Sequence, residues 1–425
     1  MTGLIIFGSL LIGMFMGLPV CFALLAACLI YLIPSGIPLT IVPQTMIAGM
    51  NSFVLLAIPL FTMTGYLMEQ TSLSRRLVDF VEALFCRSRG SMGVVTIVTC
   101  AIFAALTGSG PATVAAIGAI MMPALTRANY PKSTSAGMIA AGGALGPIIP
   151  PSANMVVYGA AMGLSVSKMF IGGVLPGIMM AIALCLVNVY LAAKYKFAKS
   201  DVRYPKKEVL RRTARAIPTL VLPVIILGGI YSGFFTPTEA AVVSVFYGLV
   251  VGVFVYREIK LKDLKKIFYE SVLTMATVLL IMSASTIFGW ILAKQQIPQA
   301  LAKAFLGISD SKYVFLLLIN VMLLVVGMVC EAGAAMVILA PLLAPIAQTL
   351  GIDLIHFGII MMTNLAIGMM TPPVGVNLYV VCDSANVKIE GMMKYLMRYF
   401  AVLIADLLII TYFPPLSLLI PTLLK

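Results

Sequence analysis

The sequence predicts an all-α polytopic membrane protein that contains two inverted repeats, each with a re-entrant helical hairpin and a helix broken at a Pro–Pro pair. Three observations lead to this fold class. Of the 425 residues, 61% are hydrophobic and 10% are charged, and the mean hydropathy is +1.10, whereas about 25% of the residues in a soluble domain are charged. The basic residues gather between long apolar runs. Gly- and Pro-rich breaks recur within those runs at a fixed spacing.

The same composition argues against most catalytic classes. A single histidine leaves no HExxH zinc site and little histidine-based acid–base chemistry, and no P-loop or dinucleotide-binding glycine motif follows a strand-like run. No nucleophile–base pair is visible, so we do not expect an enzyme. We also expect no bound cofactor and no metal other than a transported coupling ion. The net charge of +13 comes from charges clustered between apolar runs, so we expect no nucleic-acid partner. The seven cysteines form no CxxC pair and are expected to be structural.

The first apolar run, 3–33, is too long for one typical span, since roughly 20 apolar residues cross about 30 Å of hydrocarbon. Gly17-Leu18-Pro19 at its middle favours two short antiparallel segments, with one long tilted helix as the alternative. The run lacks the basic flank and the small-residue cleavage site of a signal peptide, so we expect it to stay in the membrane. Further candidate spans lie at 52–68, 134–163, 170–193, 216–234, 238–256, 271–293, 354–382 and 399–424.

The basic residues indicate how the chain is oriented, because loops rich in Lys and Arg stay in the cytoplasm. All but five of the 28 fall in stretches that we place inside, and the exceptions are Lys168, Lys294, Lys303, Lys312 and Lys425. This orientation requires the apolar stretches 91–126 and 313–348 to enter and leave the membrane on the same side. Each is therefore expected to be a re-entrant helical hairpin, the first open to the cytoplasm and the second to the periplasm.

An internal repeat supports the two hairpins. The repeat appears when the chain is shifted by the 222 residues that separate Gly146 from Gly368. At this shift 107–113 matches 329–335, and 146–151 matches 368–373. With a shift two residues larger, the segments that precede the amphipathic stretches 73–86 and 297–306 also match. Five crossings per half would invert the second half relative to the first, which agrees with the orientation of the hairpins.

The breaks indicate where small ligands bind. In hydrocarbon each unsatisfied backbone group costs several kcal/mol, so a break is tolerated only where it is buried or lines a cavity. We expect Gly108-Ser109-Gly110-Pro111 at the tip of the first hairpin, with Thr113 starting the returning half-helix, and Ser152 and Asn154 just beyond Pro150-Pro151. Carbonyl, Ser, Thr and Asn oxygens suit a small hard cation, and a half-helix N-terminus suits an anion. A lone break is usually a kink, but paired breaks are typical of transporter sites.

Four ionisable residues in or near the spans have alternative interpretations. Glu331 stands where the first repeat has Ser109, and a carboxylate at membrane depth is either functional or a hydrogen-bonded structural group. Glu239 is expected to cap a helix. Asp406 is expected to form hydrogen bonds within the scaffold, and His356 to be a packed side chain.

The hairpins and the Pro–Pro spans lack basic residues. No Lys or Arg lies between 91 and 125 or between 313 and 381. An anionic substrate would therefore be held by bound cations, helix N-termini and hydroxyls. This pattern implies coupling to a cation.

Three motifs carry a resemblance to a known family, namely TGSGPAT at 107–113, GPIIPPS at 146–152 and MTPPVGVN at 370–377. With the repeat spacing, they look like the large membrane (M) subunit of tripartite ATP-independent periplasmic (TRAP) transporters. The resemblance covers essentially the whole chain and implies an ion-transporter-superfamily fold with a scaffold and a mobile elevator domain. Family members import organic acids, commonly C4-dicarboxylates or sialic acid, across the bacterial inner membrane on a sodium gradient. The implied partners are a small four-helix membrane subunit, expected as a separate chain, and a soluble periplasmic substrate-binding protein.

The resemblance also implies a division into domains. Residues 1–90 would hold scaffold helices and a first arm, 166–296 further scaffold helices, 297–312 a second arm, and 386–425 a C-terminal scaffold helix. The transport domain would comprise 91–165, with hairpin 91–126 and broken helix 134–163, and 313–385, with hairpin 313–348 and broken helix 354–382.

The family's binding sites carry over as two sodium sites, each between a hairpin and a break, with the substrate between the hairpin tips. The first sodium site would use Thr107, Gly108, Ser109, Gly146, Pro150 and Asn154. The second would use Val329, Glu331, Gly333, Gly368, Thr371 and Asn377. It would depend more on main-chain carbonyls, because Val329 replaces Thr107. The candidate substrate contacts are Thr113, Ser152, Asn154, Thr371 and Asn377.

Two other mechanisms stay open. A stand-alone divalent-anion carrier, coupled to sodium or protons, shares the paired hairpins and would transport without any binding protein. A proton-coupled carrier would use Glu331 in place of a sodium site.

Overall fold

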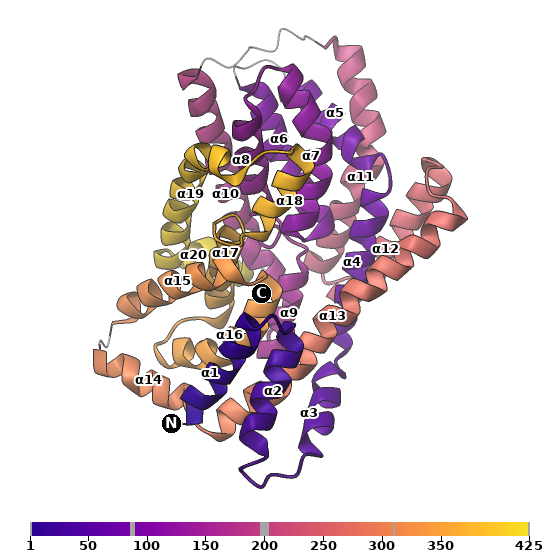
Figure 1. The fold of residues 1–425 in the computed structure, drawn as a ribbon. Coiled ribbons are helices and arrows are strands. Elements are labelled where there is room, and N and C mark those ends of the chain that lie inside the picture. The colour runs from indigo at the N-terminus through magenta and orange to yellow at the C-terminus, as the bar shows by residue number, and fades with distance from the viewer. Residues whose placement is uncertain (1, 86–89, 196–203, 309–310, 424–425) are drawn as a thin grey trace.

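The computed structural model describes residues 2–85, 90–195, 204–308 and 311–423, and this part of the chain is helical apart from short connections (Figure 1). The first half contains α1 (Thr2–Phe15), α2 (Val20–Leu32), α3 (Ile41–Met50), the 3₁₀ helix η1 (Phe53–Leu56), α4 (Ala57–Glu69), α5 (Leu73–Phe85), α6 (Ser91–Thr107), α7 (Gly110–Arg127), α8 (Lys132–Gly143), α9 (Ala153–Met162) and α10 (Val166–Lys194). The second half contains α11 (Lys206–Tyr231), α12 (Pro237–Val250), the π helix η2 (Val251–Val255), α13 (Leu261–Lys294), α14 (Ile297–Ile308), α15 (Lys312–Val329), α16 (Ala332–Thr349), α17 (Leu354–Gly368), α18 (Val376–Ala385), α19 (Ile389–Tyr412) and α20 (Pro415–Leu423). Outside the described residues lie Cys86, Arg87, Arg89, the stretch 196–203 and Lys425, which contributed to the cysteine and charge interpretations.

The N-terminal apolar run forms two helices, α1 and α2, which pack against each other. Gly17 adopts the left-handed conformation that favours glycine, with φ of 84°. Pro19 stands immediately before the first turn of α2, where a missing N–H costs nothing. The chain therefore turns at the expected place, and the prediction of two short segments is confirmed.

Six of the described helices are long and apolar enough to span a membrane, and counting two bent pairs raises that number to eight. One bent pair joins α3 to Phe53–Glu69 at 62°, so the span predicted at 52–68 is only the second part of this pair. The other joins α19 to α20 at 53°. The single C-terminal helix predicted at 386–425 is therefore two helices, because Pro414 at the junction cannot continue the hydrogen bonding of α19. The prediction of an all-helical, multi-pass membrane protein is confirmed.

The helices of the two hairpins follow the spacing found in the sequence. The first hairpin is α6 and α7 and the second is α15 and α16, and in each the helices are separated by two residues. Each hairpin is followed by a broken helix, α8 with α9 and α17 with α18. The Pro150–Pro151 and Pro372–Pro373 peptide bonds in the two breaks are both cis. The inverted relation between the halves stays a prediction.

The hairpins and the broken helices form one packed body in which the two halves interlock. α9 packs on α16 of the other half, and α18 packs on α7. Two helices expected in the scaffold join this body, since α10 packs on α6, α9 and α17, and α19 packs on α8. Gly173 lets α10 approach so closely that a Cβ there would lie 2.6 Å from the Ile148 carbonyl oxygen. The scaffold role of these two helices was implied by the family resemblance, which does not report packing partners.

The remaining helices form a second layer. α4 packs on α12 and α13, and α13 runs obliquely along α2 and α3 (Figure 1). The two amphipathic stretches predicted as arms are helices, α5 and α14. α5 buries Leu73, Leu77 and Val81 and exposes Arg75, and it packs between α6 and α11. α14 packs on α16.

Three single residues were assigned from the sequence outside the hairpins. Glu239 forms a capping box at the start of α12, as predicted. His356 is buried, with its ring nitrogens 2.6 Å from the Ser417 hydroxyl and 3.2 Å from the Thr411 carbonyl oxygen, which confirms a packed histidine. Asp406 is buried in α19. Its Oδ2 has no hydrogen-bond partner in the described residues, so the predicted hydrogen bond is not found at this oxygen.

Candidate functional site

In both hairpin tips a side chain caps the returning helix. Gly108 ends α6 in the left-handed conformation, with φ of 62°, and Ser109 caps α7 by accepting a hydrogen bond from the Ala112 N–H at 3.4 Å. In the second hairpin Glu331 caps α16 by accepting a hydrogen bond from the Ala334 N–H at 3.0 Å. A carboxylate at a helix N-terminus is stabilised by the helix dipole. Glu331 therefore has the structural role considered for it, while its side chain stays exposed at the tip.

Glycines bring the first tip against the first Pro–Pro break. A Cβ on Gly108 would lie 2.7 Å from the Pro151 carbonyl oxygen, and a Cβ on Gly146 would lie 2.4 Å from the Gly110 nitrogen. Both positions therefore require glycine. Ser152 is fully buried at this junction, and its hydroxyl has no hydrogen-bond partner within the described part of the chain. A buried hydroxyl without a partner is costly unless a ligand satisfies it.

Two threonines lie inside the first tip. The hydroxyl oxygens of Thr107 and Thr113 are 3.3 Å apart, and Thr113 donates a hydrogen bond to the Ser109 carbonyl oxygen at 2.7 Å. Thr113 is 0% exposed and Thr107 is 8% exposed. Thr113, predicted as a substrate contact, therefore presents no surface to a substrate and instead belongs to the polar interior of the tip.

The two asparagines that follow the breaks cross between the repeats. Asn377 is fully buried at the first tip, where a Cβ on Gly110 would lie 3.2 Å from its Oδ1 and a Cβ on Gly143 would lie 2.8 Å from its Nδ2. Among the described residues, neither amide atom of Asn377 has a hydrogen-bond partner. Asn154 lies at the second tip, with its Oδ1 3.0 Å from a Cβ on Gly333. The sequence analysis placed each asparagine with the hairpin of its own repeat, but α9 packs on α16 and α18 packs on α7.

Main-chain contacts hold the second hairpin to the second break. The Val374 and Gly375 N–H groups both donate to the Met328 carbonyl oxygen at 3.1 Å. Gly368 is so close to Gly327 that a Cβ on it would lie 2.4 Å from the Gly327 carbonyl carbon. The second tip therefore contacts the break after α17 as the sequence predicts, but through the backbone.

Two predicted members of the second sodium site direct their side chains elsewhere. The Thr371 hydroxyl donates to the Ile367 carbonyl oxygen at 2.8 Å within its own turn. The Val329 side chain is 48% exposed and lines an apolar cavity beside α1. Only the main chain of Val329 is therefore available to a cation.

Two adjoining cavities of about 440 and 450 Å³ lie in front of both tips. Ser109, Asn154 and Glu331 line both of them. The opposite walls come from α4 and α13, where the Tyr66 hydroxyl lies 3.0 Å from the Thr274 hydroxyl. The sequence analysis missed these hydroxyls, because isolated Tyr and Thr residues on a long span form no motif. The match between the segments that precede the amphipathic stretches 73–86 and 297–306 was the only hint.

The electrostatics of the two cavities suit an anion together with a cation. Of the described residues, Glu69 and Glu331 line them, but no Lys or Arg does. Three helix N-termini, those of α7, α9 and α16, open onto them. Free N–H groups at helix N-termini attract anions, and a bound cation would offset the carboxylates. Ser152, Thr371 and Asn377, three predicted substrate contacts, line neither cavity.

Comparison with known proteins assigns the family. Residues 7–416 match the family model described as tripartite ATP-independent periplasmic transporter, DctM component. The C4-dicarboxylate TRAP transporter large permease protein DctM of Pseudomonas aeruginosa is 41% identical over 87% of this chain and 86% of its own length. The sialic acid TRAP transporter large permease protein SiaM of Vibrio cholerae is 36% identical over 96% of both chains. The isethionate TRAP transporter permease protein DctMQ of Oleidesulfovibrio alaskensis is 43% identical over 96% of this chain, which spans 65% of its length.

A solved structure supports the fold. The crystal structure of the Alcanivorax borkumensis YdaH transporter matches with a TM-score of 0.64 over 88% of this chain and 87% of that chain, at 15% identity. At this identity the similarity concerns the fold alone. The family assignment depends instead on the match over nearly the whole chain and on relatives that are transporter permeases. The chain belongs to the TRAP transporter family, as the large membrane subunit, the DctM component.

Proposed function

We propose that this subunit forms the sodium-coupled part of a secondary active importer for a small organic acid anion in the bacterial inner membrane. The observation that best supports this function is the pair of cavities at the hairpin tips, which three helix N-termini face and which no basic side chain of the described chain lines. An anion beside Glu69 and Glu331 needs a bound cation to offset their charge. The names of the relatives from P. aeruginosa and V. cholerae support the C4-dicarboxylate or sialic acid class of substrate.

We place the first sodium ion between Thr107, Ser109 and the first break, and we add two residues to the predicted set. Ser152 and Asn377 are buried at this tip with side-chain oxygens that lack partners in the described structure. Sodium is a hard cation that oxygen ligands satisfy, so one ion would resolve both. The second ion would lie between Glu331, Asn154 and the main chain of 368–375.

The substrate would move by an elevator mechanism in which α6–α10 and α15–α20 travel as one unit. This unit is larger than the hairpins and broken helices alone, because α10 and α19 bury their surfaces against them. The scaffold would be α1–α4 and α11–α13, with α5 and α14 as arms. Breaks within the unit stay covered by protein throughout, which avoids exposing unsatisfied backbone groups to lipid.

The subunit would work with a small four-helix membrane subunit and a periplasmic substrate-binding protein, each a separate chain. Uptake into proteoliposomes tests this arrangement and the coupling ion together. The two membrane subunits are reconstituted, and uptake of a C4-dicarboxylate or of sialic acid is measured with and without a sodium gradient and the binding protein. The proposal predicts uptake only when both are present.

Two outcomes would replace the proposal with its alternatives. Equal uptake with potassium on both sides and only a proton gradient would establish a proton-coupled carrier. Sodium-driven uptake that needs no binding protein would establish a stand-alone divalent-anion carrier.

A further inference from the structure

A polar cavity of about 650 Å³ lies away from the hairpin tips, between α5 and α11. Five arginines line it, namely Arg75, Arg76, Arg211, Arg212 and Arg215. The other lining residues are Ser72, Asp79 and Glu208, so positive charge is in excess. The proposed transport mechanism makes no use of this cavity.

The α5 side of the cavity is held in place by a carboxylate. Arg76 lies with its Nη2 2.8 Å from the Glu258 Oε1 and its guanidinium 3.7 Å from the centre of the Tyr256 ring. The Ser72 backbone N–H donates to the other oxygen of Glu258 at 2.7 Å. Burial raises the pKa of Glu258, but the hydrogen bonds from Ser72 and the charge of Arg76 have the larger combined effect. The pKa of Glu258 is therefore below its ordinary value. Glu258 is therefore ionised at neutral pH and fixes Arg76.

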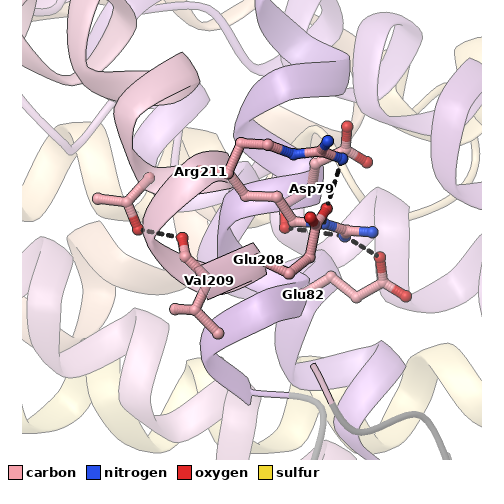
Figure 2. Close-up of polar contacts among 7 residues, drawn as sticks. Asp79, Glu82, Glu208, Val209 and Arg211 are labelled. Carbon is pink, nitrogen blue, oxygen red and sulfur yellow. Dashed lines mark hydrogen bonds and ion pairs between the residues drawn. The ribbon is translucent and has the colours of Figure 1, made fainter. Parts of the chain in front are cut away.

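On the α11 side of the cavity, the arginines outnumber the carboxylates that pair with them. Arg212 lies 3.2 Å from both Glu208 and Glu82, and Arg211 lies 2.9 Å from the same Glu208. Figure 2 shows Glu208 and Arg211 of α11 beside Asp79 and Glu82 of α5. These pairs join the two helices, while one carboxylate, Glu208, serves two arginines.

The two remaining arginines are free to bind an anion. Arg75 on α5 and Arg215 on α11 are exposed, and neither forms an ion pair with another described residue. A guanidinium binds two oxygens of a phosphate at once, which an isolated ammonium group does not do. A concave site with excess positive charge also concentrates anions. The lining therefore suits a phosphate group.

The cavity lies where α11 changes from basic to apolar. After Arg215 the helix becomes apolar, and its exposed Ile217 and Val224 lie on the side of α11 opposite the cavity. A soluble phosphate would use only the arginines. A phospholipid would use the arginines for its headgroup and keep its acyl chains in the hydrocarbon beside the apolar part of α11.

We propose that this cavity binds the phosphate of an anionic phospholipid at the cytoplasmic surface of the membrane. The phosphate lies against Arg75 and Arg215, and the acyl chains extend into the hydrocarbon beside the apolar part of α11. Because α5 is the first arm, the bound lipid ties this arm to α11 of the scaffold.

Native mass spectrometry of the purified subunit in detergent tests the proposal, with phosphatidylglycerol and phosphatidylcholine as probes. We expect phosphatidylglycerol to be retained and phosphatidylcholine to be lost. The double variant Arg75→Ala/Arg215→Ala should bind phosphatidylglycerol about 30-fold more weakly, the loss expected for two arginines that face an anionic lipid. Lys206→Ala/Lys207→Ala is the matched control, since it removes two exposed charges from α11 that do not line the cavity. Its affinity should stay that of the wild type.

Three results would overturn the proposal. Wild-type affinity in Arg75→Ala/Arg215→Ala would exclude the cavity, and an equal loss in the lysine variant would show a general effect of surface charge. Displacement of phosphatidylglycerol by millimolar inorganic phosphate would show a site for a soluble anion. The melting temperature without lipid checks folding, and Arg75→Gln/Arg215→Gln replaces the alanine pair if that temperature falls.

Discussion

Replacing Asn377 with leucine distinguishes a sodium ligand from a packing residue. Asn377 is 0% exposed, and neither amide atom has a hydrogen-bond partner in the described chain. An unsatisfied buried polar group costs about 1–3 kcal/mol, and leucine has nearly the same shape. Without sodium, the free energy of unfolding of Asn377→Leu should therefore equal that of the wild type or exceed it by about 1–3 kcal/mol.

Sodium should stabilise the wild type relative to Asn377→Leu. A ligand at ten times its dissociation constant stabilises the folded state by about 1.4 kcal/mol, which is of order 2 °C in melting temperature. The wild type should show this shift when sodium replaces potassium at constant ionic strength. Asn377→Leu should lose the part of this shift that comes from the first ion, because the oxygen that would bind that ion is gone, while the second ion would still bind.

Asn188→Leu is the matched control. Asn188 is also 0% exposed with both amide atoms unpartnered in the described residues, but it packs against Gly93 on α6 and lies at neither tip. This variant should keep the full sodium-dependent shift. A full shift in Asn377→Leu would refute the assignment, and loss of the shift in both variants would show that sodium does not act through Asn377.

Three further variants test the site and the movement. Ser109→Ala removes a tip oxygen and should raise the sodium concentration for half-maximal uptake several-fold. Gly146→Ala puts a Cβ 2.4 Å from the Gly110 nitrogen and should stop uptake and destabilise the fold by about 1–3 kcal/mol, measured by thermal unfolding. Gly289→Cys with Pro341→Cys joins α13 to α16 across 3.7 Å between Cβ positions, so oxidation should stop uptake in a background without the native cysteines.

Each of these variants has a control in the chain. The Thr126 hydroxyl forms a hydrogen bond within its own helix at the far end of α7, so Thr126→Ala should keep the sodium dependence of the wild type. An equal change in Ser109→Ala and Thr126→Ala would show that Ser109 does not belong to the sodium site. A Cβ on Gly8 meets nothing within 4 Å, so Gly8→Ala should keep stability and uptake. Gly13→Cys with Ala23→Cys joins α1 to α2 within the scaffold and should allow uptake when oxidised. If the protein still transports substrate while the α13–α16 disulfide is formed, the elevator movement is disproved.

The sequence predicts the helices well where backbone chemistry forces a break. Gly17 and Pro19 turn the chain between α1 and α2, and Pro150-Pro151 and Pro372-Pro373 lie in the non-helical segments that separate α8 from α9 and α17 from α18. The bend before α20 escaped prediction, although Pro414 marks it, because the apolar composition continues unbroken across it. Local signals fix where a helix ends but not whether two helices form one span.

The composition of a helix does not predict which other helices it packs against. α10 and α13 are both long and apolar, yet α10 packs on α6, α9, α17 and α19, whereas α13 packs on α2, α3 and α4 and meets the hairpins at α16. Gly172, Gly173 and Gly177 lie on the buried face of α10, but glycine is common in membrane helices. The same limit applies to Asn154 and Asn377, whose positions in the repeat were predicted correctly while the tips they reach were not.

This crossing gives a physical reason for the two halves to move together. Asn377 lies against Gly110 and Gly143 in the first half, and Asn154 lies against Gly333 in the second. Sliding one half past the other would withdraw each asparagine from the opposite tip and separate α9 from α16 and α18 from α7. The buried amide and the backbone of each break would then meet lipid, where an unsatisfied polar group costs several kcal/mol. Moving both halves as one body would avoid this cost, so we expect the boundary of the proposed moving unit to follow the interlocked helices rather than the order of the chain.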